Sequence, residues 1–361
     1  MTSSWRTGFA GQLGISFLVV IGAVLPFILS GYWLSVITLV LVFSIFAASI
    51  NLLAGYAGMV TLGQGGTLAV AGYAVAYIST HTDRGYVAQI AIAMAAVIVV
   101  SAIFGLMAVR ATLVYFLMVT LAQGMVIWGL AYSLSSITGG ENGIPDVNRP
   151  AGLSGAYAFY YVCFGIAVVT MAAISVFVRS PFGLGMRAIQ SNEGRARAVG
   201  YNTTLHRFLA FMASGCIAGV AGILLVYLNE FISPSIAYFQ MSADGMVMAL
   251  IGGLGTTLGP LVGALFLVVM KNVVSGHISR WPTVEGIFFI VIVLYARHGL
   301  VGLVNDGWRK IRGRMSTNGA RSRSDQQQET DVRAVDGDDS SRVSTDDLLG
   351  KPEKSMRNEE S

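Results

Sequence analysis

The chain has 361 residues, of which 54% are hydrophobic and only 12% are charged, with a formal net charge of +4 and a mean hydropathy of +0.67. About a quarter of the residues of an ordinary soluble protein are charged, so this composition excludes a soluble globular protein and indicates a polytopic membrane protein. Of the 42 charged residues (23 basic plus 19 acidic), 23 follow residue 297, and basic residues that flank apolar spans mark a membrane side rather than a nucleic-acid site.

The apolar runs predict an all-α protein with about ten transmembrane helices, since about 20 apolar residues are needed to cross a bilayer. We place these spans at 12–30, 32–53, 58–79, 87–109, 112–136, 157–178, 207–228, 241–257, 259–276 and 282–297. Residues 1–11 form the N-terminal segment, and the run after them has no cleavage site, so we expect a retained first span. The membrane domain covers 12–300, and the charged tail 301–361 should be disordered.

Each half of the chain contains one glycine-dense apolar segment: GYAGMVTLGQGGTLAVAGY at 55–73 and LIGGLGTTLGPLVGAL at 250–265. The spans that contain them can be broken or re-entrant, which requires cover by protein or by a water-filled path. Five spans per half would invert the second half relative to the first, as in many transporters whose substrate path lies at the junction. The alternative is that the glycines serve close helix packing.

The basic residues predict the orientation. With ten spans and the N-terminus inside, twelve basic residues fall on the inner side, five of them the arginines of the loop 179–207, and three fall on the outer side. Cytoplasmic loops carry the excess of Lys and Arg. We therefore expect the loop 179–207 and the tail in the cytoplasm, and the turn-rich loop 138–156 outside.

The sequence offers no catalytic or metal-binding constellation. Its four histidines lie at span ends or in loops, without metal-ligand spacing, and both cysteines lie in apolar runs. We expect the charged residues near the later spans to lie at span ends, and the mid-span polar residues to be neutral; the former are Glu230, Asp244, Lys271 and Glu285. A secondary carrier usually needs an ionisable relay near mid-membrane. The chain also lacks a GxxxxGK[ST] loop, so any ATP that drives transport binds another subunit.

The loop 179–207 predicts two short helices. Ser180 is a good N-cap and Pro181 suits the first helical position, and an apolar stripe follows at Phe182, Met186 and Ile189. A second helix can begin near Asn192, with Glu193 in its first turn and Gly200 as its left-handed stop. Such helices suit docking into a groove on a partner. The alternative is a basic loop that binds anionic lipid.

This loop resembles the cytoplasmic coupling motif of permeases in the branched-chain amino-acid ABC transporters. The matching residues are Ser180, Pro181, Phe182, Gly183, Arg187, Ala188, Ile189, Asn192, Glu193, Ala196, Ala198 and Gly200. Further similar blocks lie at 51–73, 115–122, 138–144 and 251–264, so the resemblance covers nearly the whole membrane portion. Within the family, the chain is similar to the longer of the two permease types.

The resemblance implies a permease subunit of an ATP-driven importer in the plasma membrane, not an enzyme. It implies pairing with a second permease, two ATPase subunits that bind ATP and Mg beneath the membrane, and an extracytoplasmic binding protein; the chain itself holds no cofactor. Leucine, isoleucine and valine are the implied substrates. Urea, short amides or another small amino acid are alternatives, and a secondary carrier is the alternative of a different class.

Two sets of residues follow as candidates. Coupling to the ATPase subunits is expected of Gly183, Arg187, Glu193 and Gly200, with apolar docking contacts from Phe182, Met186 and Ile189. The translocation path is expected to be lined by neutral polar side chains, which are Asn51, Thr61, Gln64, Thr120 and Gln123. The alternative for the second set is that each hydrogen-bonds across a helix interface, which stabilises by about 0.6 kcal/mol.

Overall fold

The computed structural model describes residues 22–26, 31–82, 85–111, 114–150, 152, 155–275 and four positions between 283 and 290. The chain divides into two compact units, Met1–Val304 and Asn305–Ser361, and all described residues belong to the first. The N-terminal segment 1–11 and the tail 301–361 lie outside the described residues, as do most of the first and last predicted spans.

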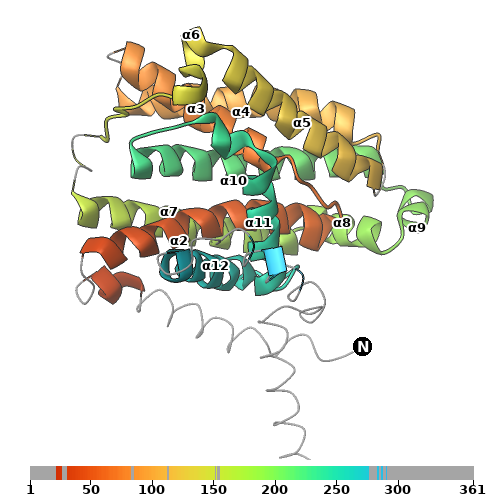
Figure 1. Ribbon diagram of the computed structural model, residues 1–361. Coiled ribbons are helices and arrows are strands. Elements are labelled where there is room, and N and C mark those ends of the chain that lie inside the picture. The colour runs from red at the N-terminus through yellow and green to blue at the C-terminus, as the bar shows by residue number, and fades with distance from the viewer. Residues whose placement is uncertain are drawn as a thin grey trace, which may run out of the picture. The chain divides into compact units, whose positions relative to one another are not determined.

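The described residues form helices and no strand, which confirms the all-α prediction (Figure 1). The elements are α2 (Gly31–Asn51), the π-helix η1 (Leu52–Ala57), α3 (Gln64–His81), α4 (Tyr86–Ala108), α5 (Val114–Ser133), α6 (Ser135–Thr138), η2 (Gly140–Asn142), α7 (Ala156–Arg179), α8 (Pro181–Ser191), α9 (Glu193–Ala198), α10 (Thr203–Asn229), η3 (Pro234–Ala237), α11 (Phe239–Gly252) and α12 (Gly259–Ser275). Five of the described helices are long and apolar enough to cross a membrane: Gly31–Ala57, α4, α5, α7 and α10.

Helices α2 and α10 form the centre of the described bundle. Helix α10 packs against α2, α3 and α4, and α2 packs in addition against α7, α11 and α12. In their most apolar windows 83% of α2 and 67% of α10 is buried, against 22% to 28% for α4, α5 and α7. The latter three helices therefore present apolar faces to lipid or to another subunit.

Glycines allow the close approach of α10 to α3. A Cβ on Gly222 would collide with the backbone carbonyl of Leu68, and one on Gly72 would overlap the side chain of Val226. Small residues let backbones approach in membrane interfaces, where apolar lipid removes the usual driving force for helix association. Close packing is therefore one confirmed use of glycine in this chain.

The first glycine-rich segment contains a helix break. Residues 31–57 form one helix that ends in a π-helical stretch, and Gly58 follows in the left-handed region, with φ 70°. The chain then runs without helix to Gly63, where a Cβ would collide with the carbonyl oxygen of Thr120 in α5. The span predicted at 58–79 thus begins six residues late, at Gln64, because the break is needed for this crossing.

The second glycine-rich segment is broken in the same way. Helix α11 has 14 residues, about 21 Å at 1.5 Å per residue, which is less than the hydrocarbon core of about 30 Å. It ends at Gly252, and Gly253 and Gly255 follow with φ of 101° and 76° before α12 begins at Gly259. The expectation that the span at 241–257 is interrupted is confirmed.

The second break meets the end of the helix that leads into the first break. The backbone N–H of Gly255 donates to Oδ1 of Asn51 at 2.8 Å, and Nδ2 of Asn51 donates to the carbonyl of Thr256 at 2.8 Å. Gly55, one turn after Asn51, lies so close to Gly255 that a Cβ on Gly55 would collide with the backbone of Gly255. The non-helical backbone of one half is thus covered by the other, as buried irregular backbone in a membrane requires.

Candidate functional site

The segment between α7 and α10 folds as the sequence predicts. The Ser180 hydroxyl accepts from the N–H of Gly183 at 3.3 Å and caps α8, with Pro181 in its first turn. Asn192 caps α9 by accepting from the N–H of Arg195 at 2.9 Å, and Asn202 caps α10 in the same way. Figure 1 shows α8 and α9 together at one end of the long helices, which we call the α8–α9 end.

Gly200 ends α9 in the left-handed conformation, with φ 100°. The N–H of Gly200 donates to the carbonyl of Arg197 at 3.0 Å, and that of Tyr201 donates to the carbonyl of Ala196 at 3.1 Å. This paired pattern is the usual helix stop around a left-handed glycine. The predicted positive φ of Gly200 is confirmed.

The apolar stripe of α8 packs inside this chain. Met186 and Ile189 are 2% and 5% exposed, and Met186 belongs to a core cluster with residues of η1, α7 and α10. The ring of Phe182 stacks on His206 of α10 at 4.8 Å between centroids. The expectation that Met186 and Ile189 dock on a partner therefore needs correction, because these side chains anchor α8 to its own bundle.

The face that α8 leaves exposed carries other residues. Leu184 is 57% exposed, and Arg187 and Ala188 are also exposed. Gly183 lies against the carbonyl of Val178 at the end of α7, so its lack of a side chain allows the tight turn between α7 and α8. Coupling through these residues stays a prediction.

Glu193 joins α9 to α10. Its carboxylate pairs with Arg197 at 3.0 Å, one turn along α9, and with Arg207 of α10 at 2.7 Å. The Glu193 side chain is 29% exposed and that of Arg207 is 19% exposed, so the second pair is partly shielded from solvent. Glu193 is thus a structural link in addition to its place in the first turn of α9.

Helix α8 also contacts the π-helix that precedes the first break. The Arg187 guanidinium lies 5.3 Å from the centroid of the Tyr56 ring, and Nε2 of Gln190 donates to the carbonyl of Gly55 at 3.3 Å. Gln190 also lies directly against Gly58. Sequence reasoning missed Tyr56 and Gln190, because a π-helix has no periodicity signal of its own. π-Helical turns often occur at functional sites.

All five predicted path residues are buried at interfaces between segments of this chain. Gln64 donates to Ser214 of α10 at 3.0 Å, Gln123 donates to the carbonyl of Phe104 in α4 at 2.9 Å, and Thr120 accepts from the N–H of Leu62 at 3.3 Å. The hydroxyl of Thr61 accepts from the N–H of Gly63. Asn51 bonds to the second break, so four of the five residues join segments of the chain, Thr61 bonds within the first break, and none of the five lines the cavity described next.

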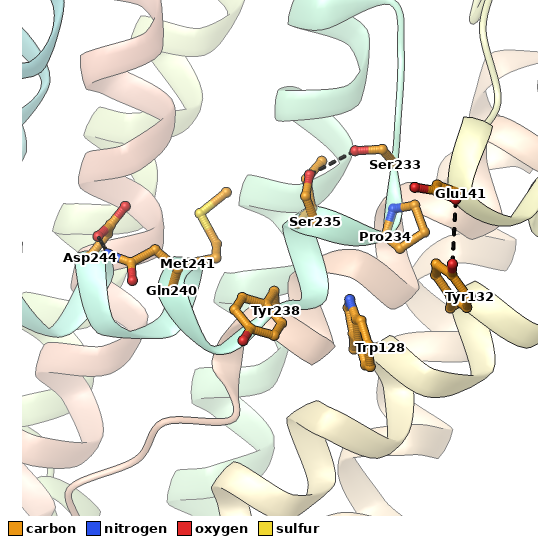
Figure 2. A pocket seen from close by; sticks show the side chains of 11 residues that line it. Trp128, Tyr132, Glu141, Ser233, Pro234, Ser235, Tyr238, Gln240, Met241 and Asp244 are labelled. Carbon is orange, nitrogen blue, oxygen red and sulfur yellow. Dashed lines mark hydrogen bonds between the residues drawn. The ribbon is translucent and has the colours of Figure 1, made fainter. Parts of the chain in front are cut away.

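A cavity of small-molecule size lies elsewhere among the described residues. Its volume is about 470 Å³, within the roughly 300–1,000 Å³ of small-molecule sites. Its lining combines aromatic, acidic, polar and apolar side chains: Trp128, Tyr132, Tyr238, Glu141, Asp244, Ser233, Ser235, Gln240, Pro234, Ile236 and Met241 (Figure 2). We call it the aromatic–acidic cavity.

The aromatic–acidic cavity opens at the end of the bundle opposite α8–α9. Trp128 and Tyr132 lie in the last turns of α5, whereas Val114, at the start of α5, shares a smaller cavity with Gly58 and Arg207. Glu141 belongs to the loop that follows α5, which the sequence places outside. The short helix α11 begins at the wall of the cavity, because its preceding segment 230–238 folds inward from the end of α10.

The charged residues near the span ends differ in burial. Glu230 does end α10, but Asp244 lies inside α11 with its side chain 10% exposed. Its carboxylate pairs with Lys271 of α12 at 3.2 Å and accepts from Nε2 of Gln240 at 3.0 Å. The sequence could not separate the two cases, because the pair of Asp244 with Lys271 joins two helices that only the fold brings together. Among the described residues, no group of His, Cys, Asp and Glu side chains is placed to hold a metal ion.

The comparisons with known proteins also identify a transport permease. The family described as "Branched-chain amino acid transport system / permease component" matches residues 32–296. The chain is 24% identical over 317 residues to the high-affinity branched-chain amino acid transport system permease protein LivM of Salmonella typhimurium, covering 80% of this chain and 75% of the relative. The LivM protein of Escherichia coli K12 is 24% identical over 311 residues, with coverages of 79% and 73%.

A shorter type of permease is also similar. The probable branched-chain amino acid transport permease protein LivH of Methanocaldococcus jannaschii is 24% identical over 213 residues, which are 55% of this chain and 66% of the relative. No solved structure gives a significant match to the chain.

Proposed function

The chain belongs to the family of branched-chain amino-acid transport permeases, with the longer, LivM-type members among its relatives, and on this premise we propose that it is the transmembrane subunit of an ATP-driven importer for leucine, isoleucine and valine. It is an integral membrane protein of a transport system, and ATP hydrolysis belongs to separate ATPase subunits that bind ATP and Mg. The plasma membrane is its proposed location, with the α8–α9 end in the cytoplasm, where the positive-inside rule places the five arginines of 179–207.

The observation that carries the proposal is the contact between α8 and the first helix break. A partner that binds the exposed face of α8 and displaces this helix would act directly on Gly55 and Gly58, because Gln190 contacts both. The non-helical stretch from Gly58 to Gly63 then leads to Gln64, which is tied to α10 through Ser214. Breaks in buried helices are where a bundle can bend, since helix kinks concentrate at π-bulges. The ATPase subunits would drive this bending from below.

The opposite end is proposed to receive the substrate. The aromatic–acidic cavity opens there and has the volume of a small-molecule site. An extracytoplasmic binding protein would release the amino acid above it, and the path would continue past the second glycine-rich break, where Gly255 meets Asn51 of α2. Asn51, Thr61, Gln64, Thr120 and Gln123 would then act by holding the segments that open, rather than by lining a preformed channel.

The weakly buried faces of α4, α5 and α7 support association with a second permease and with lipid. Helix α5 borders the aromatic–acidic cavity and exposes Val126, Leu130 and Tyr132. A second permease seated against α5 would close the open side of this cavity and complete the path. The bilayer would cover the remaining apolar faces.

A specific observation favours each of two alternatives, a different substrate and a secondary carrier. The cavity has polar walls that can also bind urea, short amides or another small amino acid. A secondary carrier is favoured by the Asp244–Lys271 pair, which places ionisable groups inside the helical part of the chain. The resemblance of α8–α9 to a coupling motif weighs against the carrier, because a carrier has no ATPase to contact.

The test is uptake by vesicles that contain this chain with its genetically neighbouring transport subunits. Leucine should accumulate only when ATP is present with the ATPase subunits and when the binding protein is present outside. A variant with Leu184→Arg and Ala188→Glu on the exposed face of α8 should abolish ATPase co-purification but not insertion. Accumulation by this chain alone without ATP would identify a secondary carrier, and uptake of urea but not leucine would replace the substrate.

A further inference from the structure

We propose that the aromatic–acidic cavity is a binding site for the ammonium group of the transported molecule, with Asp244 as the recognising residue. The inference rests on the proposed function for its setting, and it deepens it by naming the chemical class: a small molecule that carries a primary ammonium group beside an apolar side chain. Free amino acids belong to this class, whereas urea and simple amides do not.

Asp244 is placed to accept a hydrogen bond from a ligand in the cavity. The residue is 7% exposed, on the second turn of α11, and it still lines the cavity. Gln240 and Lys271 each provide one hydrogen bond to its carboxylate, at 3.0 and 3.2 Å. An ionised carboxylate offers about four acceptor sites, so Asp244 can accept from a ligand without first releasing either partner.

Two aromatic rings lie between the two acidic side chains of the cavity. Figure 2 shows the rings of Tyr238 and Trp128 between Asp244 at one end of the cavity and Glu141 at the other. The ring centroids of Trp128 and Tyr238 are 5.6 Å apart with the rings tilted by 59°, and Tyr238 is 45% exposed. Aromatic faces attract cations and also pack against apolar side chains. A ligand with an ammonium head and an apolar body finds a partner for each part here.

The carboxylates of the cavity should select against neutral molecules. A carboxylate with little access to water makes charge-assisted hydrogen bonds, which are about twice as strong as neutral ones. Lys271 offsets part of the charge of Asp244, so the preference for a cation rests on the acceptor sites that Asp244 keeps free and on the second carboxylate, that of Glu141. The site should therefore distinguish leucine from its analogues that lack the ammonium group, whatever the binding protein selects above it.

The test uses the complete transporter in vesicles, with a reporter thiol introduced as Ser235→Cys at the exposed wall of the cavity. The rate of its labelling by a membrane-impermeant maleimide is measured while L-leucine, L-leucinamide, isocaproate, N-acetyl-L-leucine or urea is added outside. The chain without the reporter gives the background from Cys163 and Cys216. L-Leucine and L-leucinamide should slow the labelling, and the other three should not at equal concentration.

Matched variants assign the effect to Asp244. Asp244→Asn should raise the half-protecting concentration of leucine roughly 10- to 100-fold, since it removes a charged partner, and Glu141→Gln at the exposed rim should change it by about twofold or less. Because Asp244→Asn leaves Lys271 beside an uncharged partner, the double variant Asp244→Asn, Lys271→Met provides a charge-balanced version. It should show the same loss, whereas Lys271→Met alone should keep or improve protection by leucine.

Three outcomes would overturn the inference: protection by isocaproate equal to that by leucine, unchanged protection in both Asp244 variants, or no protection by any ligand in the wild-type chain. These outcomes are distinct from a failure of the proposed function. Labelling is read without ATP or uptake, so a transporter that does not accumulate leucine can still show ammonium-dependent protection, and one that accumulates leucine can still lack it.

Discussion

Asn51 and Gly255 are 204 positions apart in the sequence, and the N–H of Gly255 donates to Oδ1 of Asn51 at 2.8 Å. The same amide donates from Nδ2 to the carbonyl of Thr256. Asn51 thus satisfies a donor and an acceptor in non-helical backbone, where neither group has a helical partner. The pair joins the second glycine-rich break to α2, the helix that leads into the first break.

Asn51→Leu should therefore destabilise the protein. Leucine has a similar volume but leaves the N–H of Gly255 and the carbonyl of Thr256 unpaired, at a cost of about 1–3 kcal/mol for each buried group. The thermal unfolding midpoint of the purified protein in detergent should fall. The matched control is Thr38→Val in the same helix, since the Thr38 hydroxyl is equally buried but bonds only to the Leu34 carbonyl one turn earlier. Equal midpoints for the two variants would contradict the role of Asn51.

Gln190→Ala should uncouple ATP hydrolysis from transport without unfolding the protein. The side chain is exposed, and its one bond of 3.3 Å to the Gly55 carbonyl contributes little to stability. Its loss should nevertheless weaken the contact between α8 and the first break. We expect normal expression and ATPase binding, with a lower ratio of leucine transported to ATP hydrolysed. Ser191→Ala, at an exposed neighbouring position without this contact, should leave the ratio unchanged.

Glu193→Lys should prevent productive contact with the ATPase subunits. The new cation would face Arg197 and Arg207, and the loss of a charged hydrogen-bond partner costs about 1.5–3 kcal/mol. The orientation of α9 on α10 should change, and ATPase co-purification and uptake should both fall. The additional exchange Arg207→Glu should restore part of both. If the loop only binds anionic lipid, Glu193→Lys adds a cation and leaves uptake intact.

Much of the fold followed from local chemistry that the sequence displays. Ser180, Asn192 and Asn202 cap helices because their side chains accept from the free N–H group three residues later, and Gly200 stops α9 because only glycine adopts φ near +100° without strain. Apart from the start of α3, the ends of the described spans were placed within a few residues, because apolar length is a strong signal. The exact span count stays a prediction, since the first and last spans lie mostly outside the described residues.

The α8 contacts and the aromatic–acidic cavity could not be predicted from local sequence patterns. Met186 and Ile189 form a correct amphipathic stripe, but periodicity cannot say whether a stripe packs on its own chain or on a partner. The cavity is built from two stretches that lie far apart in the sequence, α5 with the loop after it and η3 with α11. Trp128 and Tyr238 were missed for that reason, since single aromatic residues in apolar runs carry no signal of their own.

The proposed orientation predicts which ends of the helices face outward. Gly152→Cys, in the loop after α5, should react with an impermeant maleimide added outside intact cells, because the position is exposed and a side chain there meets no neighbour. Ser191→Cys, also exposed, should react only after the membrane is opened. Gly140 is a poor reporter because it is buried with φ 58°. Reaction of Ser191→Cys from outside would reverse the orientation.

Gly200→Val should reduce coupling more than stability. Valine at φ 100° is strained by about 1–2 kcal/mol, and the position has no neighbour within 4 Å, so the cost comes from the backbone alone. The strain can be relieved by shifting the turn between α9 and α10, which moves Glu193 away from Arg207. Insertion and pairing with the second permease should stay normal, while ATPase association and substrate-stimulated hydrolysis should fall.

Gly194→Ala is the matched control for Gly200→Val. Gly194 lies in α9, the helix that Gly200 ends, with an ordinary backbone, and a Cβ there meets only Oδ1 of Asn192 at 3.5 Å. Alanine should be tolerated and should stabilise α9 slightly, by up to about 1 kcal/mol. Equal uptake and equal ATPase co-purification by the two variants would show that the turn at Gly200 tolerates distortion. The loop 179–207 would then be a basic segment under the membrane, and coupling would have to be sought on the exposed face of α8.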